Sequence, residues 1–204
     1  MVGATMSQEF SKLFNIHEKP KMWIARHGET EWSKSGQYTG RTDLPLTKHG
    51  EEQARQAAEK IKGVDFGLVL VSPMQRARKT AELMGIKNYE IDPDAMEWNY
   101  GDYEGISAAD VRKTNPNYVI WDDGVPHGET IEQVAARADK VIARVKEAGN
   151  LNSLVVCHGH FSRILAARWL TMDPHMGKHF LMETAHISIM GWDKKAPAVE
   201  KWNG

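Results

Sequence analysis

The sequence has only one cysteine, Cys157, among its 204 residues. A single thiol excludes an intramolecular disulfide framework and is typical of a reducing compartment such as the cytoplasm. The chain also lacks any apolar run that approaches the roughly 18 residues of a membrane-spanning helix. Its formal net charge is -1, so no general field attracts nucleic acid or an acidic membrane. We therefore expect a cytoplasmic protein with neither a nucleic-acid nor a membrane partner.

Two kinds of segment are missing as well. There is no P-loop and no GxGxxG pattern, which argues against the common nucleotide-binding loops. The first residues, 1–20, have no long apolar stretch after a basic start, so we interpret them as a short tail and not as a signal peptide. The remaining 21–204 suit a single domain. Within it, 93–128 is rich in tryptophan, glycine, aspartate and proline, and we predict an insertion that covers part of the domain.

Short apolar runs alternate with helical patterns along the chain. The runs at 22–25, 67–71 and 154–157 are typical of strands buried on both faces of a mostly parallel sheet. Strands that alternate with helices in this way predict an α/β domain, with three layers in the order α/β/α around a mostly parallel central sheet.

Capping residues mark where the helices begin. Thr47 and Thr130 each precede an amphipathic segment, and Gly149 is expected to follow the end of the second one. Ser72 followed by Pro73 predicts another helix, capped by the serine and with the proline at its first position.

Charged and imidazole side chains follow the ends of all three predicted strands. Arg26 and His27 come directly after the first strand, the helix after the second carries Arg76, and His158 follows the third. In open parallel sheets, sites form at the carboxyl ends of the strands. If the three strands are parallel neighbours, these four side chains converge. Two guanidinium groups with two imidazoles predict an anion site, because the guanidinium fork suits phosphate oxygens.

The combination also predicts chemistry beyond binding. A neutral imidazole such as that of His27 is a competent nucleophile near pH 7, and adjacent positive charge favours the neutral form. A phosphoryl group that passes to it spreads negative charge over oxygens that Arg26, Arg76 and His158 could hold. Gly159 lets its backbone amide approach the same group. The leaving oxygen then needs a carboxylic acid as a proton donor.

At this point the chain resembles a known family, the histidine phosphatase superfamily, also called phosphoglycerate mutase-like. The resemblance begins at Arg26-His27-Gly28-Glu29-Thr30, which is similar to the family signature. Five more stretches resemble family blocks and occur in the family order: LPLTKHGEEQA (44–54), SPMQRARKTAE (72–82), EWNYGDYEG (97–105), GETIEQV (128–134) and VVCHGH (155–160). The resemblance therefore covers nearly the whole chain.

The resemblance implies a role for each matching residue. His27 would be the nucleophile and form a phosphohistidine that water hydrolyses, while Arg26, Arg76, His158 and Gly159 would bind the phosphate. Glu97 would be the general acid for the leaving group and the base for the water. The family needs no metal and no other cofactor. Candidate substrate contacts are Ser33, Thr39, Gly40 and His160.

Some of these residues have other interpretations. His160 can instead cap a helix or contact the insertion, and Trp98, Tyr100 and Tyr103 either wall the pocket or pack the insertion. The run Cys157-His158-Gly159-His160 suggests zinc, but no second ligand pair with the usual spacing accompanies it.

Three departures from the family's mutases favour a phosphatase. The stretch between Glu97 and His158 is short, Ser33 follows Trp32 where mutases have asparagine, and no insertion carries the arginine cluster that clamps a second phosphate or carboxylate. Stretches 32–40 and 97–105 resemble small acid phosphatases, and fungal sedoheptulose-1,7-bisphosphatase is related through them. We thus expect a metal-independent phosphomonoester hydrolase that acts on a small phosphorylated metabolite, such as a sugar phosphate.

Two other functions stay open. One is a 2,3-bisphosphoglycerate-dependent phosphoglycerate mutase, and the other is a catalytically idle member that binds phosphorylated ligands or a protein partner. Because the family contains monomers, dimers and larger assemblies, a homodimer is one alternative for the assembly.

Overall fold

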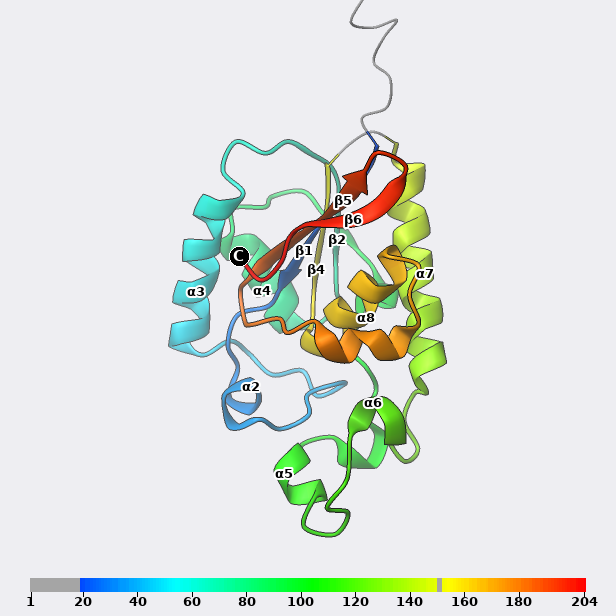
Figure 1. The fold of residues 1–204 in the computed structure, drawn as a ribbon. Helices are drawn as coiled ribbons and strands as arrows, with labels where there is room; N and C mark the ends of the chain where they lie inside the picture. Colours follow the sequence, from blue (N-terminus) through cyan, green and yellow to red (C-terminus); the bar gives the residue numbers. More distant parts are fainter. Residues whose placement is uncertain (1–18, 150–151) are drawn as a thin grey trace, which may run out of the picture.

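A computed structural model of the chain describes residues 19–149 and 152–204 (Figure 1). The tail predicted over 1–20 lies almost wholly outside these described residues. The rest forms one central sheet with helices on both faces.

The sheet has six strands in the order β3-β2-β4-β1-β5-β6. The four strands on one side of it are mutually parallel, whereas β5 and β6 run antiparallel. The strand bounds are β1 (Lys21–Arg26), β2 (Phe66–Val71), β3 (Glu90–Ile91), β4 (Asn152–Cys157), β5 (Ile187–Asp193) and β6 (Ala196–Lys201). The three strands expected from the apolar runs are β1, β2 and β4, and they are parallel neighbours as the sequence predicts.

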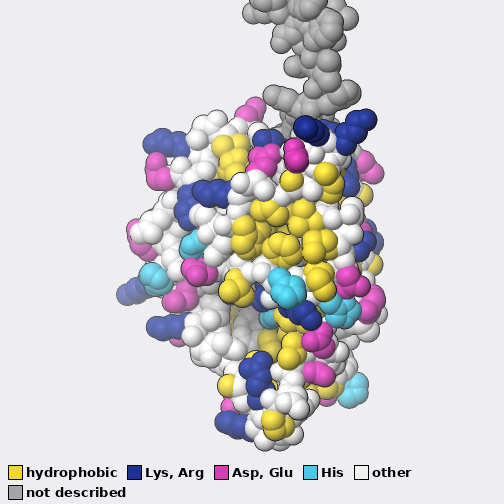
Figure 2. Space-filling model, viewed as in Figure 1, with side chains coloured by type: hydrophobic (Ala, Val, Ile, Leu, Met, Phe, Trp, Pro, Cys, Tyr) yellow, Lys and Arg dark blue, Asp and Glu magenta, His cyan; other side chains and the backbone are white. Residues whose placement is uncertain are grey.

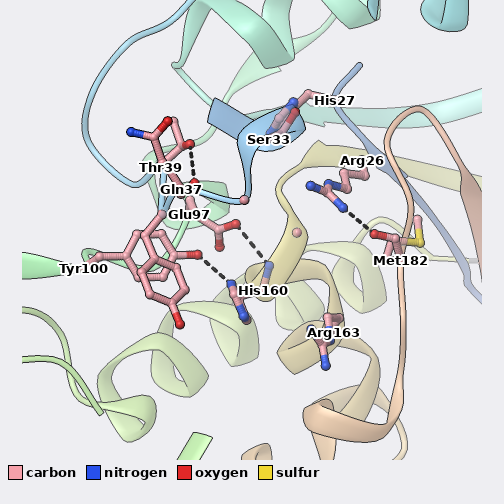
Figure 3. A pocket seen from close by; sticks show the side chains of 13 residues that line it. Arg26, His27, Ser33, Gln37, Thr39, Glu97, Tyr100, His160, Arg163 and Met182 are labelled. Carbon is pink, nitrogen blue, oxygen red and sulfur yellow. Dashed lines mark hydrogen bonds between the residues drawn. The ribbon is translucent and has the colours of Figure 1, made fainter. Parts of the chain in front are cut away.

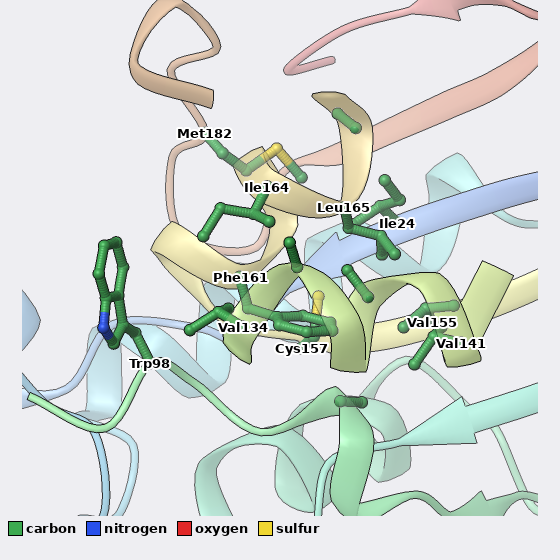
Figure 4. Packing of buried hydrophobic residues seen from close by; sticks show 14 of the residues in the cluster. Ile24, Trp98, Val134, Val141, Val155, Cys157, Phe161, Ile164, Leu165 and Met182 are labelled. Atoms are coloured by element: carbon green, nitrogen blue, oxygen red, sulfur yellow. The ribbon is translucent and has the colours of Figure 1, made fainter. Parts of the chain in front are cut away.

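Helices cover the two faces of the sheet in pairs. α7 (Ile131–Glu147) and α8 (Gly159–Trp169) pack together on one face, and α3 (Lys48–Lys60) and α4 (Gln75–Leu83) on the other (Figure 1). Alternate residues of β1 show why: Met22 and Ile24 belong to the apolar cluster with α7 and α8, while Ala25 belongs to the cluster with α3 and α4. Figure 4 shows the first cluster around Phe161. The predicted three-layer α/β/α fold is confirmed.

Three of the predicted helix boundaries agree with the structure. Thr47 accepts a hydrogen bond from the backbone N of Gly50 at 2.9 Å, and Thr130 forms a full capping box at the start of α7. Gly149 follows the end of α7 with a φ of 85°, in the left-handed region that glycine favours.

The predicted start of α4 is wrong. The helix begins at Gln75, not at Pro73, and Ser72 does not cap it. The Ser72 hydroxyl instead bonds the ring of His158 at 2.7 Å, and Asp43 accepts the hydrogen bond from Gln75 N at 2.8 Å. A distant loop therefore bonds the first amide of this helix.

The segment 93–128, which we call the covering segment, contains only short helices. It lies beyond the carboxyl ends of the parallel strands, next to α2 (Glu31–Ser35) (Figure 1). Its buried Trp98 and Trp121 join the apolar cluster of α7 and α8. The short helices here and after α8 are η1 (Pro93–Ala95), η2 (Gly101–Tyr103), α5 (Ala108–Val111), α6 (Ile120–Asp123) and η3 (Pro174–His179).

One face of the molecule carries apolar side chains over β5 and β6 (Figure 2). The exposed hydrophobic side chains of the protein include Leu181, which is 69% exposed, and Val199, which is 38% exposed. Among the helices of the described residues, none has the length and apolar character needed to cross a membrane.

Candidate active site

The residues at the carboxyl ends of the neighbouring strands β1, β2 and β4 lie close together. The ladder of β1 and β4 ends at the pair Arg26 and Cys157, and the next amide, His27 N, still donates to Cys157 O at 3.0 Å. On the other side of β4, Ser72 N donates to Val156 O at 3.0 Å. The rings of His27 and His158 consequently lie 5.2 Å apart between centroids. The structure brings together the side chains that the strand ends were expected to supply.

The tautomer of His27 follows from one contact. Nδ1 lies 2.7 Å from the carbonyl oxygen of Gly28, which can only accept, so Nδ1 carries the proton and Nε2 keeps its lone pair. The loop is fixed because Gly28 N donates to the Thr80 hydroxyl at 3.0 Å, and a Cβ on Gly28 would lie 2.3 Å from Gly50 O. Burial and the guanidinium groups of Arg76 and Arg26 hold the pKa of His27 well below 6.5, so the ring is neutral.

Arg26, at the end of β1, has a hydrogen-bond donor, Nε, that is unsatisfied among the described residues. Its Nη1 donates to Met182 O at 2.5 Å, whereas its buried Nε has no hydrogen-bond partner among the described residues. An unpaired buried donor is costly unless a ligand completes it. Gly159 allows the guanidinium to lie across the start of α8, because a Cβ there would be 3.3 Å from Arg26 Cζ. The geometry is that of an anion site.

Arg76 and His158 form the layer behind this site. Arg76 Nε donates to His158 Nδ1 at 3.2 Å, so in the neutral ring Nε2 carries the proton and donates to Ser72 Oγ. Burial and nearby positive charge, Arg76 first, hold the pKa of His158 well below 6.5. Arg76 also donates to the carbonyls of Thr39, Gly40 and Thr42. Both side chains are buried and outside the cavity lining, so their contact with phosphate stays a prediction.

Glu97 enters from the covering segment and caps the start of α8. Oε1 accepts from the backbone N of Trp98 and of Phe161, at 2.9 and 2.8 Å, and Oε2 accepts from His160 N at 3.0 Å (Figure 3). The amides of His160 and Phe161 lie in the first turn of α8, where they have no partner within the helix, so the carboxyl group replaces that missing partner. Oε2, with one amide donor, is the oxygen that has room for a proton.

Arg137 on α7 fixes the backbone that carries Glu97. Its Nη1 donates to the carbonyls of Asp94 and Met96 at 2.8 and 2.7 Å, and its Nη2 donates to Glu97 O at 3.2 Å. The same guanidinium pairs with Glu129 at 2.8 Å, and Glu129 in turn accepts from Asn99 N. The arginine therefore clamps both ends of the loop around Glu97.

These groups surround an open cavity of about 180 Å³ (Figure 3). Its lining includes Arg26, His27, Glu97 and Gly159, and we call the part of the cavity at the ends of β1 and β4 its inner end. The other lining residues come from α2 and the loop after it, the covering segment, α8 and the loop after η3: Ser33, Gly36, Gln37, Tyr38, Thr39, Tyr100, His160, Arg163 and Met182.

His160 belongs to the aromatic part of this wall. Its Nδ1 lies 2.7 Å from the Tyr100 hydroxyl, and its ring contacts those of Tyr38, Trp98 and Trp121 at centroid distances of 5.3 to 6.2 Å. Burial, with Arg163 and Arg26, lowers the pKa of His160 to about 3. His160 thus both contacts the covering segment and faces the cavity, while its backbone, not its side chain, takes part in capping.

The other predicted substrate contacts are distributed unevenly. Ser33 and Thr39 line the cavity, although the Ser33 hydroxyl also closes the capping box of α2 with Thr30. Gly40 lies outside the lining, with its amide bonded to the carboxyl group of Glu104. Of the aromatic residues with two interpretations, Tyr100 lines the cavity, while Trp98 and Tyr103 pack within the covering segment.

Sequence reasoning missed Tyr38, Arg137 and Arg163. Arg163 could have been found from helical spacing, because it follows His160 by three residues on α8 and so shares its face. Tyr38 and Arg137 act through partners that are distant in the sequence, and no local pattern marks them.

No group of three or more histidine, cysteine, aspartate or glutamate side chains in the described part of the chain is placed to hold a metal ion. The donors that face the cavity are guanidinium and imidazole groups, which fit an anion.

A family model, relatives of known name and a solved structure all match this chain. The family model described as the histidine phosphatase superfamily (branch 1) matches residues 22–204. An acid phosphatase of Mycobacterium tuberculosis is 37% identical over 176 residues, which cover 85% of this chain and 87% of the relative. Sedoheptulose 1,7-bisphosphatase of Saccharomyces cerevisiae is 36% identical over 183 residues, 74% of this chain and 67% of the relative. A solved Mycobacterium tuberculosis structure superimposes with a TM-score of 0.87 at 35% identity and covers 90% of this chain and 97% of that one.

Proposed function

Because the chain belongs to the histidine phosphatase superfamily, we propose that it hydrolyses small phosphate monoesters through a covalent phosphohistidine on His27. The observation that carries this proposal is the state of the His27 ring. Its Nδ1 proton is engaged by Gly28 O, its ring is neutral, and its Nε2 keeps the lone pair. His27 and Arg26, whose Nε is unsatisfied among the described residues, line the same cavity, so a nucleophile and an anion-binding donor are both available there.

In the first step, His27 Nε2 attacks phosphorus and the bond from phosphorus to the leaving oxygen breaks. Glu97 Oε2 gives its proton to that oxygen, so the product leaves as an alcohol. Arg26 holds the phosphoryl oxygens through Nε, with the charge of Arg76 and the dipole of His158 behind it. The N–H on His27 Nδ1 stays bonded to Gly28 O, which stabilises the positive ring that forms.

In the second step, water attacks the phosphohistidine. The Glu97 carboxylate takes one proton from the water, the bond between phosphorus and Nε2 breaks, and inorganic phosphate leaves. The acid that started the cycle and the neutral His27 are both restored. None of these steps assigns a role to a metal ion or to a cofactor.

The cavity supports a small substrate. A volume of about 180 Å³ is below the roughly 300 Å³ at which drug-sized pockets begin, so it suits a phosphoryl group with a short leaving group. The relatives named above act on small phosphorylated compounds, and a sugar phosphate is one such substrate. The buried single cysteine supports a cytoplasmic location. The exposed Leu181 and Val199 are compatible with a homodimer.

The test is phosphate release in the presence of EDTA, from a panel of phosphate monoesters that includes 3-phosphoglycerate and sugar phosphates. We expect release by the wild type and none by His27→Ala, with a phosphoryl-enzyme trapped by acid quench in the wild type alone. His49→Ala is the matched control, because His49 is an exposed histidine on α3, and it should release phosphate at the wild-type rate.

Near-native turnover by a folded His27→Ala variant would sink the proposal. Isomerisation of 3-phosphoglycerate without phosphate release would identify a mutase, and silence in both assays would favour the idle, ligand-binding alternative.

A further inference from the structure

Arg163 is a cation in the cavity wall whose purpose the phosphoryl chemistry leaves open. Its Nε and Nη2 donate to the carbonyls of Gly177 and Lys178 at 3.0 and 2.9 Å, and its guanidinium lies 4.6 Å from the ring centroid of Trp121. These contacts fix its orientation, and no residue in the described ranges accepts a hydrogen bond from its Nη1. Within residues 19–149 and 152–204 it forms no ion pair, and burial lowers its pKa to about 10, which leaves it charged at neutral pH.

We propose that Arg163 binds a second anionic group of the substrate, a carboxylate or a second phosphate on the leaving group. The inference rests on the proposed function, because it takes the phosphoryl end of the substrate to lie at Arg26 and His27. Both arginines line the same cavity, with Arg163 on α8 one turn beyond His160 (Figure 3).

The charges in the cavity favour a substrate with more than one anion. At the phosphoryl end, the positive charges of Arg26 and Arg76 balance a phosphate dianion, and Glu97 must be protonated to act as the acid. Arg163 has no ion-pair partner among the described residues, and a second anion on the substrate would supply one. An uncompensated cation that is partly withdrawn from water is unfavourable, and a carboxylate or phosphate is the group that a guanidinium fork binds best.

His160 adds a neutral donor between the two ends. Burial raises the pKa of Tyr100 well above 10, so its hydroxyl keeps its proton and is available to donate to His160 Nδ1, which lies 2.7 Å away. In the tautomer that accepts this bond, the neutral ring carries its single N–H on Nε2, for which the described residues provide no acceptor. Such a donor suits a hydroxyl or an anionic oxygen on the leaving group. Gly159, His160 and Arg163 thus line one side of the cavity with donors.

The competing explanation is purely structural: Arg163 could serve only to tie η3 to α8. That role would make the residue matter equally for every substrate. Binding of a second anion makes it matter only for substrates that carry one, so the ratio between matched substrates separates the two explanations.

The experiment measures kcat/KM on two matched pairs, in wild type, Arg163→Gln and Arg163→Lys. The carboxylate pair is 3-phosphoglycerate against glycerol 3-phosphate, and the phosphate pair is fructose 1,6-bisphosphate against fructose 6-phosphate. We expect the wild type to prefer the substrate with the second anion in at least one pair. In Arg163→Gln that ratio should fall by about 10- to 100-fold, the value of a hydrogen bond to a charged group. Arg163→Lys, which keeps the charge without the fork, should retain part of it.

The control is Arg168→Gln on the same helix, whose arginine pairs with Asp139 outside the cavity. It should leave both ratios unchanged, and circular dichroism confirms that each variant is folded. The pair that shows the preference identifies the second anion as carboxylate or phosphate.

Two results would overturn the inference while the phosphatase stands: wild-type ratios near one in both pairs, or an Arg163→Gln variant that loses activity on both members of a pair equally. If the wild type turned over no substrate, the proposed function would fail. Calorimetric binding of the same pairs to the full chain would then decide on the subsite, which is wrong if each pair binds equally.

Discussion

The two ends of the cavity are built in different ways. At the inner end, Arg26 is the last residue of the buried strand β1 and His27 directly follows it, and the backbone of the sheet continues its hydrogen bonding into His27. At the outer end, Tyr38, Tyr100 and His160 come from three separate segments. Their rings meet in stacked, tilted and edge-on pairs, with one hydrogen bond between Tyr100 and His160.

The difference separates the chemistry from the choice of substrate. Strand ends in a parallel sheet hold their side chains with little freedom, which suits a nucleophile that must meet phosphorus in one geometry. Ring contacts between loops can be exchanged without disturbing the sheet, which suits a wall that selects the leaving group. Glu97 joins the two ends, because it comes from the covering segment and caps α8.

The largest effect should come from removing the proton of the Glu97 carboxyl group, which joins the two ends of the cavity. In Glu97→Gln, the amide oxygen can still accept from Trp98 N and Phe161 N, so the fold should persist, but no proton is available for the leaving oxygen. We expect kcat on alkyl phosphates to fall by about 10²- to 10⁴-fold. On p-nitrophenyl phosphate, whose leaving group needs little protonation, the loss should be much smaller. Steady-state rates on both substrates provide the measurement.

Equal losses on the two substrates would contradict a role of Glu97 as the acid and would leave it as a helix cap. The comparison needs no second variant as a control, because each substrate serves as the reference for the other.

The next effect concerns Arg137, which holds the backbone around Glu97 in place. Arg137→Lys keeps the positive charge near Glu129 but cannot reach the carbonyls of Asp94, Met96 and Glu97 together. We expect the free energy of unfolding to fall by about 2–3 kcal/mol, since the bonds are charge-assisted and largely buried. We also expect kcat on alkyl phosphates to fall about tenfold, for a loss of about 1.4 kcal/mol of transition-state stabilisation. Urea unfolding and steady-state rates measure the two effects.

Arg144→Lys is the matched control, because Arg144 lies further along α7 and pairs with Asp92 and Glu90, upstream of the carbonyls that hold Glu97. It should lower stability without a change in kcat. An Arg137→Lys enzyme with a normal kcat would show that the loop around Glu97 keeps its position without the clamp.

The same contrast explains how much the sequence predicts. β1, β2, β4, the layers and the inner site follow from local patterns, because apolar runs mark buried strands and His27, Arg26 and His158 directly follow them. The role of Glu97 came only from the resemblance to the family, since its bonds to the amides of α8 span more than sixty positions of sequence separation.

The contacts that shape the outer end could not be predicted because they join segments that are distant in the sequence. Nothing near Arg163 in the sequence indicates that the carbonyls of Gly177 and Lys178 and the ring of Trp121 orient it. The prediction of where α4 starts was wrong for the same reason. Asp43, from another loop, accepts a hydrogen bond from the first amide of the helix, while the Ser72 hydroxyl is hydrogen-bonded to His158. Local propensity was overridden by tertiary hydrogen bonds in each case.

The smallest of the expected effects is a pH dependence of stability that arises from His160 at the outer end of the cavity. His160 has a pKa lowered from 6.5 to about 3, so below pH 6.5 the unfolded chain binds a proton that the folded chain does not. The free energy of unfolding must then decrease as the pH is lowered below 6.5. His160→Gln should remove the part of this decrease that comes from protonation of His160 in the unfolded chain. The variant should be less stable than the wild type at about pH 7.5, and the gap should narrow by about 1.4 kcal/mol at about pH 5.5. Urea unfolding at both pH values measures it, and parallel curves would mean that His160 can take up a proton without opening the aromatic wall.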